Sequence, residues 1–494
     1  MPSLPFSVRV PVLARRDALW WDVLFCSMAL SGQLNTQGLL GSTMLPTEDI
    51  ANDMLGGAGM EQWGWLSASY TVTAGLFVIL GGRLGDRFSS KFLFVAGYLL
   101  MAVFNLALGF TSSVVPFDIL RAFAGVGAAL VAPNVVGLVA KQYPPGPKRT
   151  VVFGVLGAAG PVGFMLHGVL ASLTVEYLSA RWIFWLTAIS CLIFAVLSIF
   201  VIPQDGTDPM AKLDPVGAFL GLSGMVLFNL AWNQAPVVGW HQPYVPTLLG
   251  VSLVLLVLFY VWERRKGDDA LVPTRLFTKD VVATGIALWW GWMSFGIWLF
   301  YTINFVRNIR GYHNALALCV QMVTITPVGV IAPLMVIWLN RHVKPHWTLA
   351  ASMCGFCIGS LLMGLTPAQQ SLWPMLFPAE IIVIFGPDLS FASGALIIAN
   401  AVPANMGGVA GGLVLCLTNF SLGLGLGVAG TLEVHTSQHG LDILQGYRSC
   451  FWFATCISFV GLIIVLCFVR VRGSDEAKEG RGGVKEGKGE EVPV

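Results

Sequence analysis

The chain has 494 residues, of which 56% are hydrophobic and only 11% are charged, and its formal net charge is +2. Soluble domains usually carry about 25% charged residues. This composition excludes a disordered chain, a nucleic-acid-binding protein and most soluble enzymes.

Hydrophobic runs recur along the chain, and each is roughly 20 residues long, the length that a helix needs to cross ~30 Å of hydrocarbon. We therefore expect an all-α integral membrane protein with fourteen transmembrane helices. Their expected positions are 19–44, 63–83, 92–110, 114–139, 151–172, 182–202, 215–235, 244–262, 281–304, 314–339, 347–366, 371–399, 406–432 and 450–471. The first run is too long for the core of a cleavable signal peptide.

Lysine and arginine positions predict the orientation. With a cytoplasmic N-terminus, the cytoplasmic segments carry 23 of these residues and the outer loops carry 4, while Arg121 lies inside a span. Because positive residues concentrate on the cytoplasmic side, we expect both termini in the cytoplasm. We expect a monomer in the lipid bilayer of the plasma membrane rather than of the vacuole.

The spans divide as six, two and six. The predicted parts are a cytoplasmic segment 1–18, an N-terminal six-helix bundle 19–202, two additional helices in 203–262, a cytoplasmic loop 263–280, a C-terminal six-helix bundle 281–471 and a disordered cytoplasmic tail 472–494. The fifth span of each bundle is rich in glycine, and the fourth carries charged residues. Repeated halves are typical of transporters, which bind substrate between the halves near the bilayer midplane.

The loop after the second span reads GGRLGDRFSSKFLF. It resembles the signature loop of the major facilitator superfamily, and the matching residues are Gly82, Leu84, Asp86, Arg87 and Lys91. The resemblance implies that Asp86 lies near a helix N-terminus of the other half and helps to latch a cytoplasmic gate. A carboxylate is favoured at a helix N-terminus. The alternative is a positive loop that only sets the topology.

The fourth span carries Asp118 and Arg121 one turn apart, and it resembles the second motif of the same superfamily, an Arg followed by small residues. An unpaired charge inside the membrane costs at least ~2.5–3.5 kcal/mol. Arg121 must therefore face a cavity or a partner, for which Asp118 is a candidate, unless its side chain extends to the interface.

The fifth span resembles the antiporter motif of the superfamily, a Gly-Pro pair in a glycine-rich helix. The matching residues are Gly154, Gly157, Gly160, Pro161, Gly163 and Gly168. Small residues let helices approach closely and proline bends a helix, so this pattern suits a moving interface, although static bundles use it as well.

The segment FGPDLSFASGALIIANAVPANMGGVAGGLVLCLTNFSLGLGLGVAGTLE resembles spans 12 and 13 of fungal fourteen-span drug/proton antiporters, nearest to the aminotriazole-resistance and boron-efflux type. The residues that carry the likeness are Asp388, Ser390, Phe391, Asn400, Ala401, Pro403, Gly408, Asn419, Ser421, Gly423, Gly425, Gly430 and Glu433. The polar first span, SGQLNTQGLLGSTMLP, resembles the same branch.

Two intramembrane acids are candidates for proton coupling. Asp388 lies ~16 residues into its span, near the bilayer centre. Glu380 lies eight residues earlier, on roughly the same helix face and nearer the outer surface. An acid in this position is a functional site by default, and the alternative is a neutral Asp388 that caps a helix broken after Gly386-Pro387. With Asp118 and Arg121 they form the predicted proton-coupling set.

Polar and aromatic residues within the spans are candidates for the substrate cavity. They are Gln33, Gln37, Asn134, Trp290, Gln321 and Asn419. Aromatic rings with sparse amides suit amphiphilic organic molecules, although tryptophans also form belts at the membrane interface.

These features predict a secondary active transporter that exports a small organic molecule, such as a drug, toxin or secondary metabolite, by proton antiport with alternating access. Proton-coupled uptake of a small nutrient, and efflux of borate or amino-acid derivatives, are the alternatives. The chain has no Walker loop, and its 7 histidines are scattered, which argues against ATP drive and against a membrane-embedded enzyme. We expect no metal and no cofactor, with protons and a small-molecule substrate as the partners.

Overall fold

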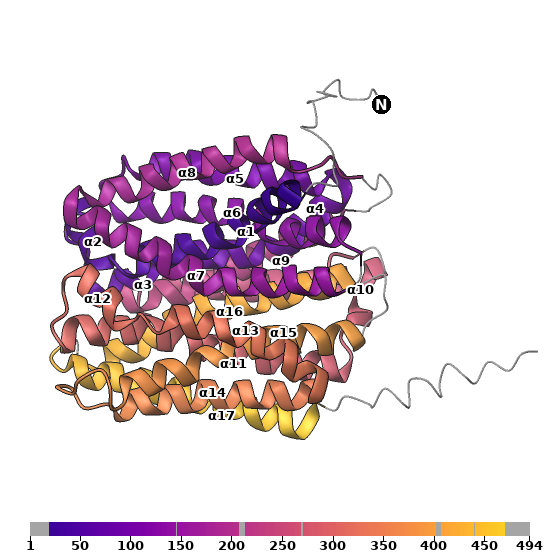
Figure 1. The fold of residues 1–494 in the computed structure, drawn as a ribbon. Coiled ribbons are helices and arrows are strands. Elements are labelled where there is room, and N and C mark those ends of the chain that lie inside the picture. Colours follow the sequence, from indigo (N-terminus) through magenta and orange to yellow (C-terminus); the bar gives the residue numbers. More distant parts are fainter. Residues whose placement is uncertain are drawn as a thin grey trace, which may run out of the picture.

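The computed structural model describes residues 19–144, 146–206, 213–267, 270–401, 407–438 and 440–469. The regular elements of these residues are all helices, and the long ones lie side by side in one bundle (Figure 1). The predicted segments 1–18 and 472–494 lie outside the described residues, as does Pro403.

The N-terminal part of the bundle consists of α1 (Leu19–Met44), α2 (Thr47–Met54), α3 (Met60–Leu76), α4 (Val78–Phe88), α5 (Ser90–Leu108), α6 (Val114–Gln142), α7 (Pro147–Tyr177) and α8 (Ala180–Val201). The short helix α2 was not expected from the sequence. A single span was expected over 63–83, but α3 and α4 meet at Phe77 with a bend of 43°.

Two further helices follow, α9 (Pro215–Val238) and α10 (Tyr244–Lys266). The C-terminal part consists of α11 (Lys279–Asn304), a π-helical turn η3 (Phe305–Ile309), α12 (Ala315–Gln321), α13 (Ile325–His342), α14 (Pro345–Leu365), α15 (Leu376–Ala401), α16 (Gly407–Thr436) and α17 (Ile443–Phe468). A short 3-10 turn, Thr274–Leu276, precedes α11. The span expected at 314–339 is interrupted after α12, and three residues separate it from α13.

The described residues contain 12 helices that are long and apolar enough to cross a membrane, or 13 if the bent pair α3–α4 counts as one span. Helix α1 is 26 residues long but is not among them. Its polar residues Gln33, Asn35 and Gln37 lower its mean hydropathy. The structure thus confirms a multi-pass helical membrane fold, whereas the count of fourteen crossings stays a prediction.

The bundle has two seams between its N-terminal and C-terminal parts, which we call the halves. Helix α3 packs on α16 at one seam, and α7 packs on α13 at the other. Helix α9 contacts both α3 and α16, so the pair α9–α10 lies over the first seam. We call the end of the bundle near the α4–α5 junction the loop end, and the opposite end, where α2 and α12 lie, the distal end (Figure 1).

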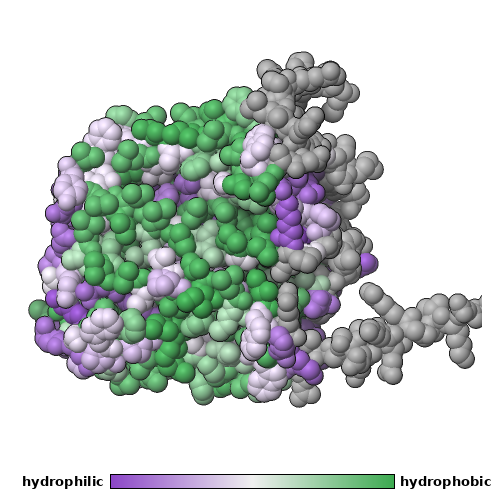
Figure 2. Space-filling view, viewed as in Figure 1, coloured by the Kyte–Doolittle hydropathy of each residue, from purple (hydrophilic) through white to green (hydrophobic). Residues whose placement is uncertain are grey.

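Hydrophobic residues form a broad band across the visible face, with hydrophilic residues at both ends (Figure 2). Many large apolar side chains are exposed on the surface of the bundle, including Ile189 and Leu192 on α8 and Val254 and Val257 on α10. A contiguous apolar surface of this kind is what a lipid-facing bundle presents.

Candidate functional site

The glycine-rich helix α7 lies at the seam with α13. A Cβ added to Gly154 would lie 2.7 Å from Ile337 Cδ1, and one added to Gly329 would overlap the Pro161 ring. The antiporter-motif residues Gly154 and Pro161 therefore face a helix of the other half. Their small size is what lets the two helix axes approach.

Other residues of the same motif face α1. A Cβ on Gly163 would lie 2.7 Å from Leu34 Cα, and one on Gly168 would overlap Leu45. Gly160 also faces α1, and the nearest neighbours of a Cβ placed on it would be Gln33 and Gln37, both at 3.8 Å. Both glutamines are partly exposed. The motif thus packs α7 against α1 on one side and α13 on the other.

Arg121 is completely buried between α1, α3 and α6. Its Nη2 donates to the carbonyl oxygen of Leu39 at 3.0 Å, and its guanidinium carbon lies 4.7 Å from the centre of the Tyr70 ring. The Tyr70 hydroxyl in turn donates to the carbonyl oxygen of Thr36 at 2.5 Å. A backbone dipole and an aromatic face therefore stabilise this intramembrane charge.

Asp118 lies on the same helix as Arg121 but is not hydrogen-bonded to it. Asp118 Oδ1 and the Nε and Nη1 atoms of Arg121 are all buried without hydrogen-bond partners. Asp118 is 6% exposed. The two residues therefore share a buried region of α6 without forming the close pair that their spacing suggests.

The two acids of α15 lie on one helix face, because Glu380, Ile384 and Asp388 follow each other at intervals of four residues. That face is directed towards α13, since Ile384 Cγ2 lies 3.9 Å from the place that a Cβ on Gly329 would take. The same position on α13 contacts α7 of the other half. Helix α13 therefore lies between the face that carries the acids and α7 of the other half, and connects the acids to the α7–α13 seam.

Glu380 is completely buried at the break between α12 and α13. It accepts a hydrogen bond from the Thr324 hydroxyl, while its Oε1 has no partner. Arg310 is the cation that acts on it electrostatically. The helix break and Thr324 were not predicted, although broken helices are common at transporter binding sites.

Asp388 is partly exposed, and its carboxylate makes no hydrogen bond or ion pair within the described part of the chain. Next to it, Pro387 interrupts the hydrogen-bond ladder of α15. The Ser390 hydroxyl donates to the Pro387 carbonyl at 3.0 Å, and Trp292 Nε1 donates to Ser390 Oγ at 3.1 Å. Side chains thus stabilise the segment around Asp388 where Pro387 interrupts the ladder.

The remaining predicted cavity residues lie in different places. Gln321 is the last residue of α12 and is partly exposed, and Asn419 faces Gly75 at the α3–α16 seam. Trp290 contacts α17 instead, with its Cβ 3.5 Å from the place of a Cβ on Gly461. Asn134 is buried and donates to two carbonyls, those of Gly81 at 3.1 Å and Leu130 at 2.7 Å. Its amide nitrogen therefore joins α4 to α6.

At the signature loop, Gly82 packs near Pro133, at 3.7 Å from a Cβ placed on it, and Asp86 is exposed in the last turn of α4. Arg87 lies over the Phe88 ring at 5.7 Å. Lys91 Nζ donates to the carbonyl oxygen of Ile199 at 2.7 Å. The loop thus contacts the end of α8 within its own half.

Asp205, which follows α8, is the central acceptor at this loop and was missed in the sequence. It accepts from Lys141 Nζ at 2.7 Å, from the Ser90 N–H at 2.8 Å, from the Lys91 N–H at 3.2 Å and from the Ser89 hydroxyl. Burial alone would raise the pKa of Asp205, but these hydrogen bonds hold it below its ordinary value. In the sequence, the departure from the family pattern at Ser89 and Ser90 was the feature that could have indicated a different partner for this loop.

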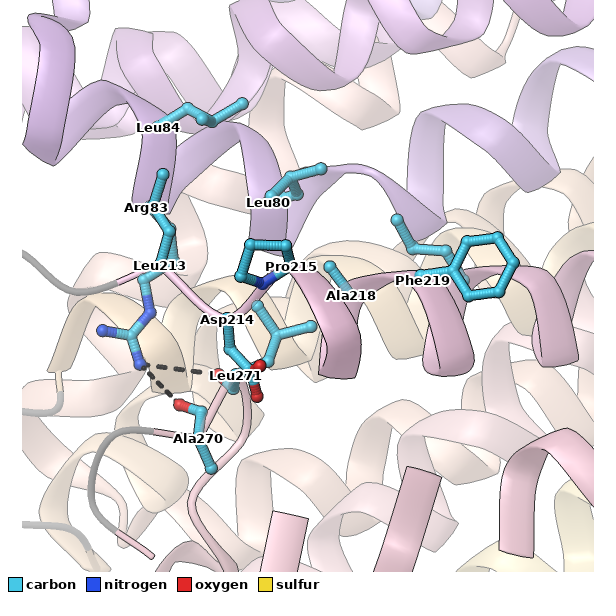
Figure 3. Close-up of a pocket in the computed structure, with 11 residues that line it drawn as sticks. Leu80, Arg83, Leu84, Leu213, Asp214, Pro215, Ala218, Phe219, Ala270 and Leu271 are labelled. Atoms are coloured by element: carbon cyan, nitrogen blue, oxygen red, sulfur yellow. Dashed lines mark hydrogen bonds between the residues drawn. The ribbon is translucent and has the colours of Figure 1, made fainter. Parts of the chain in front are cut away.

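A pocket of about 370 Å³ lies beside the signature loop, between α4, α9 and the segment before α11 (Figure 3). Arg83 lines it and donates from Nη2 to the carbonyl oxygens of Ala270 at 3.3 Å and Leu271 at 3.5 Å. Its other lining residues are Leu80, Leu84, Leu213, Asp214, Pro215, Ala218, Phe219 and Leu222. None of the predicted coupling acids reaches this pocket, so it is separate from the candidate transport site.

Comparisons with known proteins identify the fold family. Residues 28–331 match the model of the Major Facilitator Superfamily. The chain is 34% identical to the aminotriazole resistance protein of Saccharomyces cerevisiae over 476 residues, covering 93% of this chain and 87% of that protein. It is 33% identical to a low affinity ammonium transporter of the same yeast (464 residues; 92% and 90% covered) and 32% identical to the efflux pump terJ of Aspergillus terreus (466 residues; 92% and 89% covered).

Among solved structures, a peptide transporter POT in complex with sulfate superposes with a TM-score of 0.67 at 15% identity, covering 96% of this chain and 97% of the other. This likeness concerns the fold alone. The match to the family model and the fungal relatives together show that the chain belongs to the major facilitator superfamily, in the branch of fungal drug-efflux and aminotriazole-resistance proteins.

Proposed function

We propose that this membrane transporter, which we do not expect to be an enzyme, exports a small organic molecule in exchange for protons. Asp388 carries the proposal, because it is a partly exposed carboxylate without a protein partner in the middle of α15. Relatives named as efflux pumps support export. We further propose that both termini are cytoplasmic, in the plasma membrane, and that the monomer suffices.

The chemistry rests on the cost of an anion inside an apolar bundle. A carboxylate within the membrane interior that has no partner is disfavoured as an anion, whereas its protonated form is tolerated. Asp388 therefore needs a proton, water or a cationic group of the cargo in each state of the cycle. Exchange of the proton for cargo at this position couples the two fluxes, and Glu380 beside α13 links protonation to the seam.

The test compares Asp388→Asn with Asp442→Asn in proteoliposomes under an imposed pH gradient. Asp442 only caps the first turn of α17, where Asn also caps, so this variant is the matched control. Aminotriazole and a panel of amphiphilic drugs serve as cargo. We expect Asp388→Asn to lose pH-driven transport while Asp442→Asn keeps it, and equal pH-driven rates in both variants would contradict the role of Asp388.

The predicted gate at the signature loop is tested by Asp86→Asn. If Asp86 latches the loop end, turnover falls while the amount of protein in the membrane is unchanged. Unchanged turnover would reduce the loop to a topological signal.

Transport of ammonium is a second candidate, because one relative that covers 92% of this chain is named a low affinity ammonium transporter. Uptake of labelled methylammonium into cells with and without the protein distinguishes the two. Uptake that depends on the protein, together with unchanged drug sensitivity, would favour this second function over drug export.

A further inference from the structure

Arg307 is a buried cation at the distal end of the bundle. It lies in the π-helical turn η3 directly after α11, and its side chain is 1% exposed. Arg307 lies between the expected spans 281–304 and 314–339 and is one of the 4 lysine and arginine residues counted in the predicted outer loops, where a charged residue is normally solvated. Its burial requires partners.

Most of these partners come from the other half. Arg307 Nη2 donates to the carbonyl oxygen of Leu45, which follows α1, and Nε lies 3.5 Å from Glu48 Oε2 in α2. The guanidinium carbon lies 5.5 Å from the centre of the Trp63 ring in α3. From the C-terminal half, Asn304 Oδ1 accepts a hydrogen bond from Nη1 at 3.2 Å.

The segment just before α12 adds two further contacts across the same boundary. His313 Nδ1 lies 3.2 Å from Glu48 Oε2, the oxygen that faces Arg307. Asn314 Nδ2 donates to Glu176 Oε2 at 2.7 Å, at the distal end of α7. The carboxylates thus belong to the N-terminal half, and the nitrogen atoms that face them belong to the C-terminal half.

We propose that Arg307, Glu48, His313, Asn314 and Glu176 form the distal gate of the transporter. In this structure the gate is closed, and opening the distal side requires the Arg307–Glu48 and Asn314–Glu176 contacts to separate. The proposal rests on the motion of two halves, which is part of the proposed function, but it does not depend on proton coupling or on the cargo.

The physical reason is that the gate contacts are strong only while the halves meet. The Arg307 side chain, which is 1% exposed, donates a hydrogen bond to the Leu45 carbonyl oxygen and forms an ion pair with Glu48, whereas the Asn314–Glu176 hydrogen bond is exposed to solvent. When the halves separate, water solvates both groups and replaces the pair. The closed state is therefore stabilised by contacts that a neutral substitution of Glu48 weakens, without disturbing the packing inside either half.

The test measures distances between spin labels by pulsed electron resonance in lipid nanodiscs. Tyr177→Cys and Leu441→Cys place labels on exposed distal positions of the two halves, at 75% and 86% exposure. The pair Tyr177→Cys and Phe110→Cys, both in the N-terminal half, is the matched control. The exposed native cysteines Cys456 and Cys467 are replaced by serine.

In this background Glu48→Gln removes the charge and keeps the side-chain size. Glu48 is 27% exposed, so the variant is expected to fold. We expect the population with a longer distance between the halves to rise at least about fivefold, with no change in the control pair. Because two contacts close the gate, Glu48→Gln with Asn314→Ala is measured as well.

Distance distributions that are unchanged in both variants would overturn the proposal and make these contacts a fixed tie between loops. A longer distance in the control pair would overturn it too, because it would mean that the N-terminal half itself had loosened. Loss of pH-driven transport in Asp388→Asn leaves this measurement unaffected. The failure of the gate and the failure of the proton mechanism are therefore distinguishable.

Discussion

The contact between α7 and α1 offers a sharp test of the packing described above. The change is Gly163→Ala. In the structure a Cβ at this position would lie 2.7 Å from Leu34 Cα and even closer to the Leu34 carbonyl oxygen. These are backbone atoms, so no side-chain rotation can make room, and α1 must move away from α7 by about 1 Å to bring the nearest of them, the Leu34 carbonyl oxygen, to ordinary contact at 3.4 Å.

The expected magnitude follows from two opposing effects. Overpacking a well-packed interior costs about 1–3 kcal/mol. Alanine in place of glycine within a helix recovers up to about 1 kcal/mol. Because the clash is with backbone atoms, the cost lies at the upper end of the first range, and we therefore expect a net loss of about 2 kcal/mol. Gly163 belongs to the segment of α7 that resembles the antiporter motif. Because the substitution displaces α1 from this segment, transport should decrease as well.

The assay is thermal unfolding of the purified protein, with Gly160→Ala as the matched control in the same motif. A Cβ on Gly160 would have its nearest neighbours at 3.8 Å, which is ordinary contact. Gly160→Ala should therefore unfold at or slightly above the wild-type temperature, and Gly163→Ala clearly below it. If the two variants unfold at the same temperature, the close packing of α7 on α1 is refuted.

Three further predictions concern other contacts. Gly427→Ala places a Cβ 2.7 Å from the backbone of α9 and should lower the unfolding temperature, whereas Gly411→Ala in the same helix meets nothing within 4 Å and should not; equal temperatures would contradict the close approach of α9 to α16. Asp205→Asn should destabilise the protein at neutral pH, because the folded state holds the pKa of Asp205 below its ordinary value. That stabilisation is present above about pH 4 and disappears as the pH falls through the folded-state pKa, so the two melting curves should converge in acid; a constant difference would refute it. Arg121→Gln should cost about 1.5–3 kcal/mol through the lost hydrogen bond of a charged donor, measured by thermal unfolding, and an unchanged temperature would mean that Arg121 is not stabilising.

The helices were largely predictable because hydrophobicity and length identify spans directly. Helix α1 marks one limit, since its polar residues bring its hydropathy below that of the other spans although it packs against α7. The bend at Phe77 and the break before Thr324 mark another. Hydropathy does not register which backbone hydrogen bonds are lost, so both breaks lie inside runs that read as single spans.

The sequence predicted which residues belong to the candidate site better than it predicted which residues they contact. Glu380 and Asp388 were identified because acids are rare in spans. Their spacing predicts that they share a helix face, but it does not predict that this face is directed towards α13 and the seam. Arg307 was assigned to a loop, because its partner Glu48 is 259 positions away in the sequence. Only the folded chain brings such residues together.

The pair α9–α10 makes the molecule unequal on its two sides in the plane of the membrane. Helix α9 lies against α3 and α16 and covers the seam between them. At the other seam, Gly157 of α7 and Leu334 of α13 are exposed on the apolar surface. Lipid tails therefore contact the α7–α13 seam directly, whereas at the α3–α16 seam they contact the pair α9–α10. A hydrophobic compound dissolved in the bilayer therefore meets an uncovered seam on one side of this transporter and a covered seam on the other.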